Sequence, residues 1–139
     1  MTRAVFDSST VISGCGWGAE SYQCLITVAQ RRVRSLATEA IVTEWRQTLA
    51  ELESAGTRFR HSPRPTLEWF IDASHIVTPS PLAAQVSRDK KDAPYIACAL
   101  AAKAQFIVSR DRDLLDLEKP FGVEIVTPRT FLSRLRLGN

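Results

Sequence analysis

The sequence lacks any apolar run long enough to cross a bilayer, because polar residues interrupt every hydrophobic stretch. It also lacks paired cysteines. Cys15, Cys24 and Cys98 are odd in number and show no CxxC spacing, which argues against a disulfide framework and against a cysteine zinc site. The opening residues, MTRAVFD, hold no hydrophobic signal region. We therefore expect reduced thiols in a cytoplasmic protein that does not associate with membranes.

Internal repeats and low-complexity tracts are absent as well, and the composition is that of an ordinary globular protein. Hydrophobic residues make up 45% and charged residues 24% of the 139 positions, enough for a domain with a buried core. We therefore expect a single domain over residues 1–139. The net charge of +3 is weakly basic, which is compatible with a nucleic-acid partner without requiring one.

The chain alternates short apolar runs with helical patterns, which predicts an α/β protein with a mostly parallel sheet. Thr38 precedes a strong amphipathic stripe and is a candidate N-cap for that helix. Residues 82–91 are expected to form a loop or a short helix. The expected strands are 3–7, 33–37, 75–78, 105–109 and 123–126, and the expected helices are 20–31, 39–54, 66–74, 93–103, 113–118 and 128–136.

Two of the expected strands end in a carboxylate. Asp7 closes the first strand in AVFDSSTVIS, and Asp111 follows the fourth in QFIVSRDRDLL. Binding sites of open parallel sheets form outside the carboxyl ends of the strands, where the strand order reverses. If the first and fourth strands are neighbours, Asp7 and Asp111 face each other there. Asp92 begins the helix that leads into the fourth strand, and Glu44 lies beside the apolar stripe of the helix at 39–54.

Carboxylates gathered at one edge raise one another's pKa unless a cation neutralises them. The cations that suit such oxygen ligands are Mg²⁺ and Mn²⁺. We therefore interpret Asp7 as a metal ligand whose neighbouring hydroxyls orient it. Each acidic residue also has a plain structural interpretation: Asp7 as the start of an Asx turn, Asp92 and Asp113 as helix N-caps, and Glu44 as a polar neighbour on an amphipathic helix.

Taken together, these motifs resemble the PIN-domain nucleases, and within them the VapC-like toxins of bacterial toxin–antitoxin pairs. The similarity covers nearly the whole chain. It is most specific over residues 88–135, where an acidic helix start, an Ala-rich helix, a strand, the SRDRDLL turn and IVTP follow in order. The opening VFDSSTVIS is similar to the family's first strand end, and ATEAIVTEWRQTL is similar to its Glu-bearing helix.

The resemblance implies a three-layer α/β/α sandwich with a central, mostly parallel sheet. It implies a Mg²⁺- or Mn²⁺-dependent endoribonuclease, commonly a homodimer or higher homo-oligomer, that an antitoxin protein holds inactive. We expect its substrate to be single-stranded RNA. By position in the family's pattern, the catalytic residues are Asp7, Glu44, Asp92 and Asp111, and the metal ligands are Asp7, Asp92, Asp111 and Asp113.

Supporting groups are expected around this centre. Ser9 and Ser109 stand where the family has Asn and Thr, and their hydroxyls would hold a ligand or a water in place. A basic rim would contact the phosphates of the RNA. The candidates for that rim are Arg58, Arg60, Arg64, Lys90 and Lys91.

Three positions depart from the family's pattern: Ser9 replaces an Asn, Ala93 an acidic residue and Arg110 a Gly. These departures leave open an alternative, a PIN-like domain of weakened catalysis that binds RNA or an antitoxin. A haloacid-dehalogenase-like phosphatase is disfavoured, because it needs a second Asp at the position of Ser9. A phospho-receiver domain is disfavoured too, because its acceptor Asp would fall near residue 50, in a helical pattern.

Overall fold

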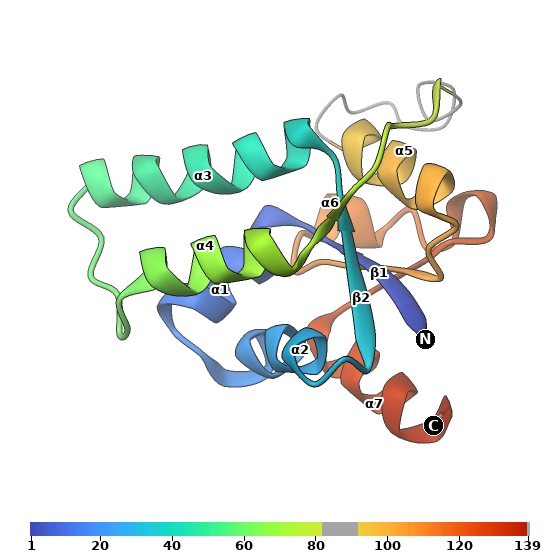
Figure 1. The fold of residues 1–139 in the computed structure, drawn as a ribbon, viewed down its shortest axis with the longest axis horizontal. Coiled ribbons are helices and arrows are strands. Elements are labelled where there is room, and N and C mark those ends of the chain that lie inside the picture. Colours follow the sequence, from blue (N-terminus) through green and yellow to red (C-terminus); the bar gives the residue numbers. More distant parts are fainter. Residues whose placement is uncertain (82–91, 139) are drawn as a thin grey trace.

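Five parallel strands form the central sheet of the structure, a computed structural model that describes residues 1–81 and 92–138 (Figure 1). The strand order is β3-β2-β1-β4-β5, so β1 lies at the centre with β2 on one side and β4 on the other. This confirms the predicted α/β sandwich, and it meets the condition that the first and fourth strands be neighbours. The strands are β1 (Thr2–Phe6), β2 (Val33–Ala37), β3 (His75–Ile76), β4 (Phe106–Val108) and β5 (Glu124–Val126).

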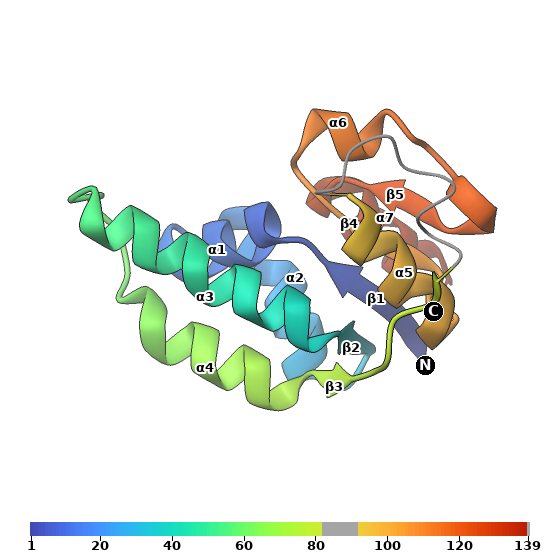
Figure 2. The ribbon, with the colours of Figure 1, turned by 90° about the horizontal axis from the view of Figure 1, so that it is seen from above.

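Helices surround this sheet. α5 packs over β1, β2 and β4, whereas α2 and α7 pack together against the other face, and α3 runs alongside α4 (Figure 2). A 3₁₀ turn, Pro120–Gly122, precedes β5. The helices are α1 (Ser8–Gly16), α2 (Ala19–Ala29), α3 (Glu39–Ser54), α4 (Pro63–Ala73), α5 (Ala93–Ala102), α6 (Arg112–Leu115) and α7 (Pro128–Gly138).

One helix was not predicted, and several boundaries differ. α1 occupies a segment whose hydroxyl residues are weak helix formers, but Asp7 accepts a hydrogen bond from the Thr10 amide and caps it. α4 begins at Pro63 rather than at residue 66, because proline is well tolerated in the first turn of a helix. The expected loop or short helix at 82–91 lies outside the described residues.

Aromatic packing fixes the end of β1. The Phe6 ring meets Phe70 of α4 at a centroid distance of 5.5 Å and Phe131 of α7 at 5.8 Å, both edge-to-face. The fully buried Trp45 of α3 donates its indole N–H to the Phe6 carbonyl at 3.2 Å. Because these three helices hold Phe6, the next residue, Asp7, leaves the sheet from a rigid support.

The first expectations from the sequence were reduced cysteines and no membrane-spanning segment. All three cysteines are free and buried, and burial raises the pKa of each thiol to about 12, which makes them unreactive. Among the residues that the structure describes, no helix combines the length and the apolar character needed to cross a membrane.

The predicted N-cap of α3 provides a test of the fold. The Thr38 hydroxyl accepts a hydrogen bond from the Ile41 amide at 3.2 Å, and the residue is buried. Thr38→Ala is therefore expected to lower the free energy of unfolding by about 1 kcal/mol in urea denaturation. Ser62, the N-cap residue of α4, makes no such bond, so Ser62→Ala should change the stability by less than about 0.5 kcal/mol. Equal losses in both variants would contradict the capping role of Thr38.

Candidate functional site

The Asp7 carboxylate lies at the carboxyl edge of the sheet and is only 4% exposed. Its Oδ1 accepts hydrogen bonds from the Ser9 hydroxyl at 2.7 Å and from the Thr10 amide at 3.0 Å. Its Oδ2 accepts a hydrogen bond from the Ser109 hydroxyl at 2.5 Å. Asp7 thus caps α1, whereas the plain structural interpretation expected an Asx turn, and it is also held from the end of β4.

Burial dominates the electrostatics of this carboxylate. Removal from water raises the pKa of Asp7, and the hydrogen bonds from Ser109, Ser9 and Thr10 oppose that rise only in part. None of the ion pairs among the described residues involves Asp7. Among the described residues no cation pairs with the charged form of this group, and binding a cation would relieve the cost of its burial.

Ser109 joins Asp7 to Asp111. While its hydroxyl donates to Asp7, its oxygen accepts the Asp111 amide at 2.9 Å. Asp111 is exposed, and its Oδ1 accepts the Asp113 amide at 3.0 Å. Asp111 is thereby the N-cap of α6, so the interpretation of Asp113 as that cap is wrong. The adjacency of β1 and β4, in which Phe6 pairs with Val108, brings these residues to one edge.

Asp92 and Glu44 lie on helices that are attached to the same edge. Asp92 is 5% exposed at the start of α5, and its side chain makes no capping bond to that helix. One turn later, the Tyr95 hydroxyl accepts the amide of Ser8, the residue after Asp7, at 3.2 Å. Glu44 is half-buried on α3, next to the tryptophan that contacts the end of β1.

The donor set suits a hard cation. A carboxylate offers about four acceptor positions, and the Ser9 hydroxyl, the Thr10 amide and the Ser109 hydroxyl occupy three of those on Asp7. Within residues 1–81 and 92–138, no three acidic, histidine or cysteine side chains lie close enough together to hold one ion. Asp111 is exposed, and to reach a cation on Asp7 its side chain would turn away from the Asp113 amide that it now accepts. The oxygen chemistry therefore fits Mg²⁺ or Mn²⁺, although the side chains do not form a closed cage.

The described members of the expected basic rim lie in the loop between α3 and α4 and in the first turn of α4. Arg58 and Arg60 are exposed in the loop between α3 and α4, and the Arg60 amide bonds to the Gly16 carbonyl at the far end of α1. Arg64 forms an ion pair with Glu53. Lys90 and Lys91 lie outside the described residues. Contact of the described arginines with RNA stays a prediction.

Some groups at this edge escaped the sequence interpretation. The Tyr95 hydroxyl and the Thr10 hydroxyl, which donates to the Val108 carbonyl at 3.2 Å, both tie the edge together. The tyrosine carried a usable signal, because a buried tyrosine in an Ala-rich helix needs a partner for its hydroxyl. The partner itself, the Ser8 amide, is far away in the sequence and has no local signature.

Comparisons with known proteins agree with this geometry. The model of a protein family described as PIN domain matches residues 3–113, more than half of the chain. The crystal structure of PAE2754 from Pyrobaculum aerophilum is similar to this chain with a TM-score of 0.68 and 17% sequence identity, over 98% of this chain and 90% of that one. This likeness shows a shared fold. None of the curated proteins matches the chain in sequence.

Proposed function

This chain belongs to the PIN-domain family, and from that premise we propose that it is a metal-dependent endoribonuclease that hydrolyses phosphodiester bonds in single-stranded RNA. PIN domains are generally nucleases that use divalent metal ions. The observation that carries the proposal is the Asp7 carboxylate. It is buried, it lacks an ion-pair partner among the described residues, and Ser109 links it to Asp111.

In this proposal Asp7, Asp92 and Asp111 hold Mg²⁺ or Mn²⁺. Bound there, the ion would polarise a phosphoryl oxygen and lower the pKa of a water molecule. The Ser109 and Ser9 hydroxyls keep the Asp7 carboxylate in one orientation, which saves reorganisation during the reaction. Glu44 would orient the attacking water or accept its proton, and Asp113 would support a second ion.

The biological setting is proposed from the resemblance to VapC-like toxins. We propose that the protein is the toxin of a toxin–antitoxin pair, that it forms a homodimer or a higher homo-oligomer, and that an antitoxin protein inhibits it. A small DNA-binding protein encoded in the adjacent reading frame would support this setting. The nuclease chemistry itself does not depend on that neighbour.

The activity has a direct test. In the presence of Mn²⁺ or Mg²⁺, the purified protein is expected to shorten an end-labelled single-stranded RNA, and excess EDTA should stop the reaction. Because a water molecule rather than the ribose 2′-hydroxyl attacks the phosphorus, the products should lack a 2′,3′-cyclic phosphate. The control substrate is the same RNA annealed to its complement. Cleavage that persists unchanged in EDTA, or that leaves cyclic phosphates, would contradict the proposal.

A second candidate is a PIN domain that binds RNA or an antitoxin without cutting. Two observations favour it: the described side chains form no three-ligand cluster, and Arg110 places a cation where the family has glycine. A domain that had lost its metal site would give little heat on titration with Mn²⁺. A catalytic site would bind the ion and would lose that binding in Asp7→Asn.

A further inference from the structure

A pocket of about 510 Å³ with a mixed polar and apolar lining lies where α1, α2, the start of α7 and the segment after β4 meet. Its lining includes Ser13, Trp17, Glu20, Arg110 and Arg129. None of these residues belongs to the set of proposed metal ligands. The volume lies in the range of pockets that enclose small ligands.

Arg110 connects this pocket to the centre. Its guanidinium donates to the Ser13 hydroxyl at 2.6 Å, which directs the side chain along α1. Its amide donates to Ser9 Oγ at 3.0 Å, and that hydroxyl donates to Asp7 Oδ1. Two hydrogen bonds therefore link the backbone of Arg110 to the buried carboxylate. Ser13 follows Ser9 by four residues on α1, so the Arg110 guanidinium lies about one helical turn from the hydrogen bonds that hold Asp7.

Trp17 provides a stacking surface. It follows α1 at a turn in which Gly18 has φ +95°, a conformation that favours glycine. The indole packs on Phe59 at a centroid distance of 5.1 Å, but 39% of the residue remains exposed. An indole that is braced by another ring and still accessible is suited to stacking on a nucleobase.

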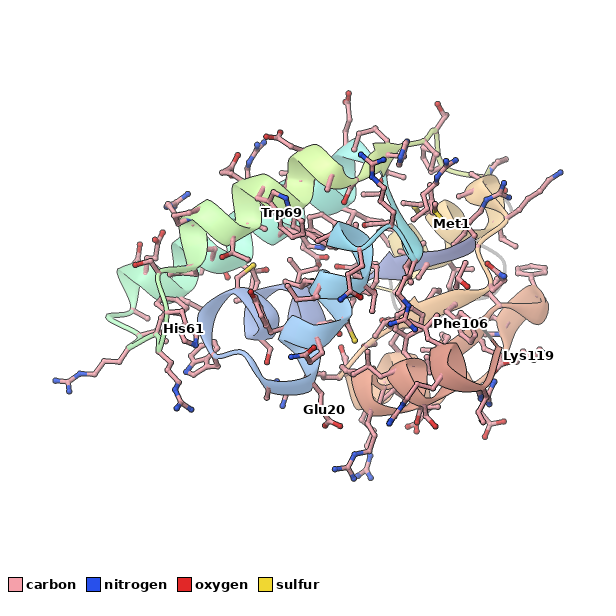
Figure 3. The ribbon with its side chains drawn as sticks, turned by 60° about the horizontal axis from the view of Figure 1, so that its bottom comes forward. Met1, Glu20, His61, Trp69, Phe106 and Lys119 are labelled. Atoms are coloured by element: carbon pink, nitrogen blue, oxygen red, sulfur yellow. The ribbon has the colours of Figure 1, made fainter. Side chains whose placement is uncertain are left out.

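The charges of the pocket favour a phosphate backbone. Arg110 and Arg129 contribute two positive charges, and Arg129 bonds to Glu20 at 3.0 Å, so the ion pair leaves the Arg110 charge in excess. Figure 3 shows Glu20 near the junction of α2 and α7, whereas Trp69, the other half-exposed tryptophan, lies on α4. The positive end of the α7 helix dipole lies at the same pocket, because Pro128 and Arg129 begin that helix.

We infer that this pocket is a subsite for the nucleotide next to the scissile phosphate of single-stranded RNA. The base stacks on Trp17, and Arg110 contacts the adjoining phosphate. This inference rests on the proposed function and adds a binding determinant outside the acidic centre. It also assigns a use to Arg110: in place of the family's glycine, the bulky cation binds the substrate backbone.

Binding without cleavage tests the subsite. A labelled single-stranded RNA of about eight nucleotides is titrated with protein in EDTA, and its fluorescence anisotropy gives Kd. Trp17→Ala should weaken binding roughly 5- to 100-fold, the usual range for one stacked base, and Trp17→Phe should retain most of the affinity. Trp69→Ala is the matched control, since Trp69 is also 39% exposed, and it should bind like the wild type.

Two further measurements distinguish stacking from a structural effect. With an abasic strand of the same length, the wild type and Trp17→Ala should bind equally, because no base is left to stack. Arg110→Gln should weaken binding of both strands and reduce the slope of log K against log salt by about one. The control is Arg32→Gln, at an exposed arginine that follows the end of α2, and it should bind both strands like the wild type. Wild-type affinity in Trp17→Ala, or equal weakening on both strands, would overturn the subsite.

The outcomes for the subsite and for the nuclease are separable. If the wild type cleaves RNA with Mn²⁺ and Trp17→Ala binds RNA normally, the subsite is wrong and the nuclease stands. If Trp17→Ala loses base-dependent binding but no metal supports cleavage, the subsite stands and the nuclease is wrong. A wild type that binds no single-stranded RNA would overturn the subsite.

Discussion

Asp7→Asn is expected to reduce RNA cleavage in Mn²⁺ on the order of 10³-fold, equivalent to about 4 kcal/mol of transition-state stabilisation. The variant removes the negative charge that would hold the ion, and it places an amide nitrogen, which has no free lone pair, at one of the two oxygen positions. Asp111→Asn should show a similar loss. Cleavage rates on an end-labelled single-stranded RNA measure both variants.

The folded structure should survive this substitution. An asparagine at position 7 keeps one oxygen to accept the Ser9 hydroxyl and the Thr10 amide, so the cap of α1 remains. Only the hydrogen bond from Ser109 changes its direction, because the new NH₂ group must donate toward that hydroxyl. Far-UV circular dichroism should therefore be unchanged, which separates a lost ligand from a lost fold.

Asp116→Asn is the matched control. Asp116 is an exposed aspartate at the end of α6, close to the site in sequence but outside the proposed ligands. Its variant should cleave RNA at the wild-type rate. If Asp7→Asn and Asp111→Asn both retained full activity while Asp116→Asn matched them, the assignment of the metal ligands would be wrong.

The sheet could be predicted from the sequence because its strands are short, apolar and regularly spaced. Parallel strands buried on both faces leave a clear signal, as Val5, Ile107 and Ile125 illustrate. α1 escaped prediction because its start depends on a single capping carboxylate in a segment rich in hydroxyls. Helix propensity alone does not favour Ser8–Gly16, and packing against α2, α3 and α4 stabilises it instead.

The site was predictable to a lesser extent. Asp7 and Asp111 could be placed at one edge because they follow strands that proved to be neighbours. The hydrogen bonds around these groups could not be predicted, because the Ser109 to Asp7 and Ser8 to Tyr95 bonds join residues that are 102 and 87 positions apart. Such contacts depend on the completed fold, and no local pattern encodes them.

The buried carboxylate also predicts how stability depends on pH. Burial raises the pKa of Asp7 above its ordinary value of 3.8, so the folded state binds the proton more tightly than the unfolded chain. Its contribution to stability is complete below that ordinary value and is lost as the pH rises through the folded-state pKa. In EDTA, Asp7→Asn should therefore gain stability relative to the wild type as the pH rises above about 4.

Near neutral pH, Mn²⁺ should make the wild type more stable than Asp7→Asn, because the cation neutralises the buried Asp7 carboxylate. At a Mn²⁺ concentration about 100-fold above Kd, the wild type should gain about 2.7 kcal/mol, a rise in Tm of roughly 10 °C. Asp7→Asn should gain little, and Asp116→Asn should follow the wild type. Thermal unfolding with Mn²⁺ and with EDTA measures each change. A wild type that gains no stability from Mn²⁺ would support the non-cutting PIN domain. In that case the buried carboxylate binds no cation, so it lowers the stability of the fold and does not take part in hydrolysis.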